Sequence, residues 1–181
     1  MKKMKGTLLA ILLAGTIALP ITYAQQPQIP TLQVCNPSKV EVEAAVYIDA
    51  REDSARRGIF KVSGRALFDS TTPYPAGRFI IGISMSDSIE GTVTTTSIDQ
   101  ITTTGKHTPV AYLSGRCDVE TPEGKLAGCR YWLMIVNNRV SENNRTPDII
   151  GFLIFSKEGK RIAYGTGPVV DGKVYVAPSS Y

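Results

Sequence analysis

From residue 40 onward, apolar and polar side chains alternate along the chain with a period of two, the pattern of a half-buried β-strand. In the first such stretch the apolar positions are Val40, Val42, Ala44, Val46 and Ile48. The positions between them include Glu41, Glu43, Tyr47 and Asp49. The sequence therefore predicts that this strand buries one face and exposes the other.

The same reading along the rest of the chain predicts nine short strands and no helix with a sustained period of 3.6 residues. These strands cover residues 40–49, 58–68, 78–85, 91–98, 108–117, 127–136, 148–156, 160–164 and 169–177. Turn-forming residues rich in Gly and Pro separate them, at 72–77, 121–124, 157–160 and 165–168. We expect a single all-β domain over residues 40–181, built as an antiparallel β-sandwich or open barrel.

Two of the predicted strands are apolar at nearly every position, over residues 131–136 and 149–155. Such continuous runs are typical of strands covered on both faces. We therefore expect these two strands to be central, with Trp132 in the core. The polar segment 137–147 joins them, and we expect an exposed loop there because burying its backbone would be costly.

The amino terminus has the three parts of a secretory signal peptide. Lys2, Lys3 and Lys5 precede a 12-residue apolar stretch over 8–19, and small residues lead up to Ala24. Cleavage after Ala24 is expected, because the stretch is shorter than the roughly 20 residues that a membrane-spanning helix needs. The sequence thus predicts a secreted or periplasmic protein with no transmembrane segment after cleavage, in which a Pro- and Gln-rich leader over 25–39 precedes the domain.

Cleavage also changes what the net charge implies. The full chain has 20 basic and 16 acidic residues, a net charge of +4, and removal of three lysines leaves 17 against 16, a net charge of +1. The basic residues that remain are not interleaved with aromatic residues in the way that nucleic-acid grooves require. We therefore expect no nucleic-acid partner.

The three cysteines are Cys35, Cys117 and Cys129. A hairpin turning around 122–124, with Thr121 opposite Lys125, places Cys117 directly opposite Cys129, close to the separation of a disulfide. We expect this bridge in an oxidising compartment, with two buried thiols or a bridge to Cys35 as alternatives. Cys35 would otherwise be free to link to another chain.

Catalytic and metal-binding motifs are nearly absent. The one histidine, His107, follows Gly105 and Lys106 in what we expect to be an exposed loop, and no nucleophile motif accompanies it. No zinc, haem or cluster motif occurs, so we predict no metal and no cofactor. Asp118 and Glu120 share a strand face, so a glycan hydrolase with paired carboxylates is the enzymatic alternative. A loose calcium site at the same acids is a further possibility.

Two features favour binding over catalysis. Thr92, Thr94 and Thr96 share one face of a predicted strand, as a row of hydroxyl and methyl groups. Tyr74 and Tyr164 lie next to turn residues, where aromatic rings with hydroxyl groups suit sugar or protein contacts. The leading hypothesis is a non-enzymatic protein that binds an envelope or extracellular polysaccharide or protein. A structural subunit that pairs with its neighbour by strand addition is the third possibility.

The last 70 or so residues also resemble a known class of domain. The segment 113–116, the apolar strand 131–136, the polar loop, and the segments 147–155 and 160–164 follow one another in an order that is similar to post-COAP-type β domains of bacterial extracellular proteins. The resemblance implies a secreted β-sandwich module without an established active site. It assigns no residue a function.

Overall fold

A computed structural model describes residues 37–49, 57–69, 73–86, 90–140 and 145–177. The predicted signal peptide, Cys35 and most of the predicted leader lie outside these residues. Within these described ranges the regular structure is entirely β, which confirms the predicted all-β antiparallel class. The nine strands are β1 (Ser38–Asp49), β2 (Arg57–Phe68), β3 (Ala76–Met85), β4 (Glu90–Thr95), β5 (Gln100–Thr104), β6 (Val110–Thr121), β7 (Gly124–Val136), β8 (Ile149–Phe155) and β9 (Arg161–Val176).

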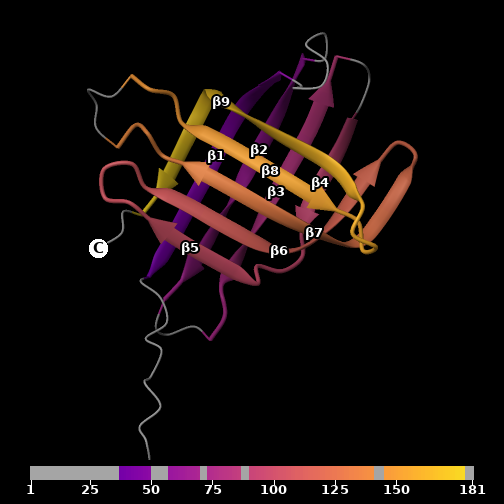
Figure 1. The fold of residues 1–181 in the computed structure, drawn as a ribbon, viewed down its shortest axis with the longest axis horizontal. Helices are drawn as coiled ribbons and strands as arrows, with labels where there is room; N and C mark the ends of the chain where they lie inside the picture. The colour runs from indigo at the N-terminus through magenta and orange to yellow at the C-terminus, as the bar shows by residue number, and fades with distance from the viewer. Residues whose placement is uncertain (1–36, 50–56, 70–72, 87–89, 141–144, 178–181) are drawn as a thin grey trace, which may run out of the picture. The chain divides into compact units, whose positions relative to one another are not determined.

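The strands form one sheet that closes into a barrel. In the order β4-β3-β2-β1-β9-β8-β7-β6 each strand pairs antiparallel with the next, and β6 returns to β4. β5 is the ninth strand and pairs with the first half of β6, beside the segment that pairs with β4. The sequence predicted a sandwich or an open barrel, whereas the sheet closes on itself. In Figure 1 the strands β6 to β8 cross in front of β1 to β4, so the two halves of the barrel face each other across the interior.

Alternation along the strands fills that interior. The five apolar residues predicted to face one way along β1 are all buried, and Glu41 and Glu43 on the other face are exposed, which confirms the prediction for this strand. Phe60 of β2 meets Phe152 of β8 edge to face, with ring centroids 4.9 Å apart. Because these strands belong to opposite halves of the barrel, the contact joins the halves through one shared core.

The observed nine strands are not the predicted nine. β5 was missed, because its five residues are mostly threonine and fell between two longer predicted strands. The predicted strands 160–164 and 169–177 are a single strand, β9, and the turn predicted at 165–168 is wrong. β9 pairs with β8 through its first half and with β1 through its second half. The segment 165–168 is therefore the place where β9 passes from one half of the barrel to the other.

The glycines of that segment allow two strands to approach closely. A Cβ on Gly165 would lie 2.6 Å from Ile48 Cδ1, and a Cβ on Gly167 would collide with the carbonyl oxygen of Tyr47. Glycine inside a strand often marks such an approach rather than a turn. These two residues let β9 lie against the end of β1 where the barrel closes.

The loop after β7 is anchored by a buried carboxylate, contrary to the expectation that the whole polar insertion is exposed. Asp148 is 3% exposed, and its Oδ1 accepts hydrogen bonds from the backbone N–H groups of Asn138 at 2.7 Å and Arg139 at 3.1 Å. Asn138 in turn donates from Nδ2 to the carbonyl oxygen of Pro147 at 2.7 Å. The base of the loop is thus buried and hydrogen-bonded, while Arg139, Val140 and residues 145–147 are exposed.

Candidate functional site

The threonine row lies on the outer surface, as predicted, but among charged side chains. Thr92 and Thr94 of β4 lie opposite Glu120 and Asp118 of β6. With Thr96 they line a depression of about 520 Å³ that also includes Arg78 and Lys125. Mixed charges around the hydroxyl groups make this a polar, hydrated surface rather than a flat row of hydroxyl and methyl groups.

Asp118 is bound within its own hairpin. Its Oδ1 accepts a hydrogen bond from the Gly128 N–H at 3.1 Å, and its Oδ2 lies 3.4 Å from Lys125 Nζ. Glu120 lines the same depression, so the two acids do share a face as predicted. The contacts of Asp118 assign it a structural role in the hairpin, which weakens the case for a pair of carboxylates acting together on a glycosidic bond.

The two described cysteines are buried and directly opposite each other in β6 and β7, but no disulfide joins them, so the predicted bridge is absent from the structure. The predicted partner of Thr121 is also wrong, because Thr121 pairs with Gly124 rather than Lys125. A β-bulge between Cys117 and Val119 shifts the register by one residue and restores the predicted opposition of the cysteines. Burial, together with the nearby Cys129 and Asp118, raises the pKa of Cys117 from 9.0 to about 12.

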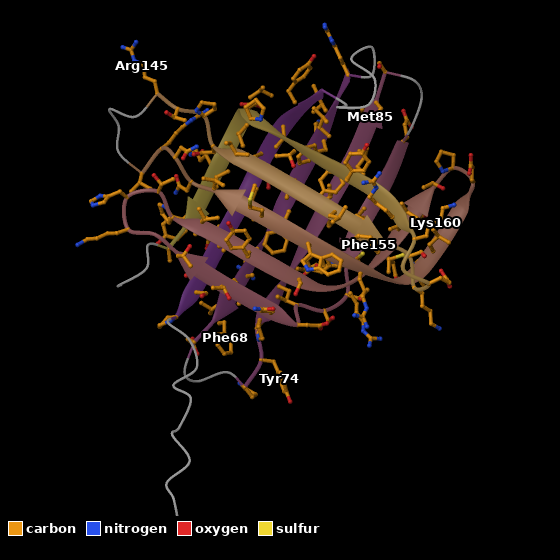
Figure 2. All side chains as sticks on the ribbon, viewed as in Figure 1. Phe68, Tyr74, Met85, Arg145, Phe155 and Lys160 are labelled. Carbon is orange, nitrogen blue, oxygen red and sulfur yellow. The ribbon has the colours of Figure 1, made fainter. Side chains whose placement is uncertain are left out.

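The three loop and strand-end residues singled out by the sequence lie apart in the structure. Tyr74 is 78% exposed in the loop before β3 and is labelled at the lower edge of the molecule in Figure 2. His107 is exposed in the loop before β6, as predicted. Tyr164 lies on β9 with the Arg161 guanidinium 4.3 Å from its ring centroid. Of these residues, Tyr164 is the one that joins a larger cluster.

That cluster includes Trp132, which the sequence analysis placed in the core. Tyr131 is 1% exposed and donates its hydroxyl to the Ser97 carbonyl oxygen at 3.2 Å, whereas Trp132 faces outward and is 48% exposed. The expectation of a strand covered on both faces is therefore wrong for β7, whereas every residue of β8 is buried or half-buried. The polar residue Arg130, next to Trp132 on the same face, was the sequence signal for this orientation, because alternation carried on from Arg130 turns Trp132 outward.

Strand register aligns the outward-facing residues of this half of the barrel into rows. One row crosses the sheet as Gln100, Ser114, Trp132, Leu153 and Tyr164. The next row crosses as Thr102, Tyr112, Met134, Gly151 and Thr166. Aromatic rings, a thioether and hydroxyl groups from four strands, β5, β6, β7 and β9, thus meet on one outer face.

A groove of about 290 Å³ runs between these rows, and we call it the aromatic groove. Its walls include Tyr112, which is 52% exposed, and Trp132. Gly151 forms part of the lining, and a Cβ there would lie 2.7 Å from Thr166 Oγ1. The lack of a side chain at Gly151 therefore leaves room for the groove at this point. Gln100 and Ser114 add hydrogen-bonding groups. The groove offers apolar ring faces together with a few polar groups, as small-molecule sites commonly do.

Phe155 holds the indole ring of Trp132 in place. The two rings pack edge to face, with centroids 5.2 Å apart and an interplanar angle of 83°. Figure 2 labels Phe155 toward the end of β8 on the front half of the molecule. A ring fixed in this way loses little conformational freedom when a ligand stacks on it.

A larger depression of about 880 Å³ lies over β1, β2, β3 and β9, and five of its eleven lining residues are charged. It contains Glu41, Glu43, Arg65, Arg78 and Lys173. Charges of both signs on an open surface are well solvated and gain little from a ligand. The aromatic groove is the better candidate because its lining combines two half-exposed rings with no charged residue, and such an apolar surface is costly to keep in contact with water.

Comparison of the chain with protein-family models, with curated proteins and with solved structures finds no match. Among the described residues no helix is long and apolar enough to cross a membrane. In the same residues no group of three or more His, Cys, Asp or Glu side chains is placed to hold a metal ion.

Proposed function

We propose that this protein is an exported, non-enzymatic β-barrel domain that binds an envelope or extracellular polysaccharide in the aromatic groove. The observation that carries the proposal is the pair of half-exposed rings, Tyr112 and Trp132, on a groove whose other groups include hydrogen-bonding side chains. The faces of aromatic rings carry partial negative charge and attract the C–H groups on the face of a sugar ring. Hydroxyl and amide groups beside the rings provide partners for sugar hydroxyls.

Export is supported by the signal-peptide pattern at residues 1–24. Secretion or a periplasmic location would bring the groove into contact with polysaccharides of the envelope or the medium. The position of Tyr164 in the same row as Trp132 adds a third ring to the surface. Thr92, Thr94, Thr96 and Tyr74 lie away from this row in the strand order and are not part of the proposed site.

Affinity electrophoresis through gels that contain envelope or extracellular polysaccharides tests the proposal. We expect Trp132→Ala to weaken retention by about two- to tenfold, because an aromatic contact contributes about 0.5–1.5 kcal/mol and 1.4 kcal/mol is a factor of ten. Tyr74→Ala is the matched control, since it removes a more exposed ring outside the groove. Absence of retention on every polysaccharide, or equal losses in the two variants, would contradict the proposal.

The hydrolase alternative has one supporting observation, the common depression of Asp118 and Glu120. Release of reducing sugar by the protein, lost in Glu120→Gln, would favour it over simple binding. The strand-addition alternative has less support, because barrel closure pairs most strand edges and leaves the five-residue β5 as the edge among the described strands.

A further inference from the structure

A row of arginines borders the aromatic groove. Arg116 of β6 lies directly opposite Arg130 of β7, Arg130 lies opposite Phe155 of β8, and Phe155 lies opposite Arg161 of β9. All three arginines are exposed. We call these three residues the arginine row. It is the next outward-facing row to the one that contains Trp132, since Arg130 and Trp132 are two residues apart on one strand.

The opposition of Arg116 and Arg130 is unfavourable in the isolated protein, because like charges directly opposite each other destabilise an antiparallel pair. Neither guanidinium has an ion-pair partner among the described residues. Three nearby acids have other partners. Asp118 pairs with Lys125, and Asp99 accepts a hydrogen bond from the Ser97 hydroxyl at 2.7 Å. Glu158, which acts electrostatically on Cys129, is hydrogen-bonded to Ser156. The fold thus keeps two like charges together beside the groove without neutralising them.

A second pair of arginines, Arg65 of β2 and Arg78 of β3, also lies directly opposite each other, but it has carboxylates on the adjacent strand. Arg65 also lies directly opposite Glu41 of β1, and Glu43 belongs to the same depression. Carboxylates on the adjacent strand lower the potential at that pair. Arg116 and Arg130 have Phe155 in the corresponding position, so the positive potential of these two residues is left for a ligand to neutralise.

From this charge complementarity we infer that the ligand of the aromatic groove is an acidic polysaccharide, whose carboxylate or sulfate groups bind Arg116 and Arg130 while a neighbouring sugar ring stacks on Trp132. This inference rests on the proposed function and narrows its ligand class. Two residues along a strand span about 6.8 Å, so adjacent groups of one polymer reach both rows. The planar guanidinium binds carboxylate or sulfate oxygens with two parallel hydrogen bonds, which a lysine would not do.

The experiment measures binding of the purified protein to polygalacturonate and to its methyl ester, which has the same backbone without the charges. We expect at least tenfold tighter binding to polygalacturonate at low salt, with a difference that shrinks as salt is added. In R116Q/R130Q we expect that preference to fall to threefold or less while binding to the methyl ester is kept. The control R65Q/R78Q removes the same charge elsewhere and should keep the preference.

The outcomes separate the two proposals. Equal affinity of the parent protein for both polymers, or an unchanged preference in R116Q/R130Q, would overturn the acidic ligand and leave polysaccharide binding intact. Loss of binding to both polymers in Trp132→Ala supports the common site. Failure of the parent protein to bind either polymer, or any neutral polysaccharide, overturns both proposals. Equal or tighter binding to poly-L-glutamate would assign the arginine row to an acidic peptide and overturn the inference.

A loss of binding in R116Q/R130Q is not expected to come from misfolding, because this variant removes a repulsion between two like charges. We expect its unfolding midpoint in urea to equal or exceed that of the parent protein. A large decrease would show that the two arginines stabilise the fold, and would contradict the premise that their opposition is unfavourable.

Discussion

At the scale of single residues, the choice of which aromatic faces inward decides the candidate site. Tyr131 and Trp132 are neighbours in an apolar run, and hydrophobicity alone does not say which is buried. The structure turns the tyrosine inward, where its hydroxyl reaches a backbone carbonyl, and leaves the larger indole on the surface. The aromatic groove depends on this choice of which residue faces outward, because a shift by one position moves every side chain of a strand to the other face.

Gly167, in the segment where β9 passes from one half of the barrel to the other, allows a testable prediction at this scale. Gly167→Ala places a methyl group against the Tyr47 carbonyl, which belongs to backbone and has little freedom to move. We expect a loss of about 1–3 kcal/mol in the free energy of unfolding, the usual range for overpacking. Urea unfolding followed by circular dichroism measures it.

The matched control is Gly82→Ala, since a Cβ at Gly82 would have no atom within 4 Å. Gly82 also lies within a strand, β3, so the two variants differ mainly in the space around the new methyl group. A Gly167→Ala protein as stable as Gly82→Ala would show that the corner of β9 relaxes freely, and would disprove the close-approach explanation.

At the scale of elements, the alternation of apolar residues predicted most strand positions correctly, but not where strands begin and end. The segment 165–168 contains two glycines and a proline, which favour a turn locally. It nevertheless continues a strand, because it pairs with β8 and the residues that follow it pair with β1. β5 is the opposite case, a strand too short for its pattern to be recognised. Both errors have one cause. Where the local sequence pattern is weak, pairing with a neighbouring strand, which is a tertiary contact, decides whether a segment forms a strand.

The β7–β8 loop supplies the prediction at this scale. Replacing Asp148 by Ala removes the acceptor for the N–H groups of Asn138 and Arg139. A buried donor left without a partner costs about 1–3 kcal/mol, so we expect a loss of at least that size in the free energy of unfolding. Asp148→Asn keeps an oxygen at the same place and is expected to lose less. Equal losses in the two variants would attribute the effect to the charge and its 4.0 Å contact with Arg139 Nε rather than to the hydrogen bonds.

At the scale of the whole molecule, the closed sheet encloses a core that contains ionisable groups. Burial raises the pKa values of Cys117, Cys129 and Tyr131, with nearby charged groups adding to the effect. The folded state therefore holds these protons at pH values where the unfolded chain releases them. The stabilisation from Cys117 is complete below about pH 9 and is lost progressively between about pH 9 and pH 12.

We accordingly expect the urea midpoint of the reduced protein to fall as the pH rises from about 8 to 11. The variant with both Cys117→Ala and Cys129→Ala is expected to start from a lower midpoint, because the core loses volume, but to show a shallower fall. The comparison of slopes is the measurement. An identical slope in the two proteins would mean that the buried thiols do not contribute to the pH dependence.

The sequence by itself determined the all-β class and the inward face of β1. Both depend on residues near one another along the chain, where alternation leaves few arrangements. The opposition of Cys117 to Cys129 was predicted from a turn register that is wrong, and the β-bulge of the folded hairpin restores it. Only the tertiary structure decided that the sheet closes, because closure pairs β1 with β9, more than a hundred residues apart. The tertiary structure also decided the candidate site. Its rings and arginines come from separate strands, and they meet only through the strand register of the closed sheet.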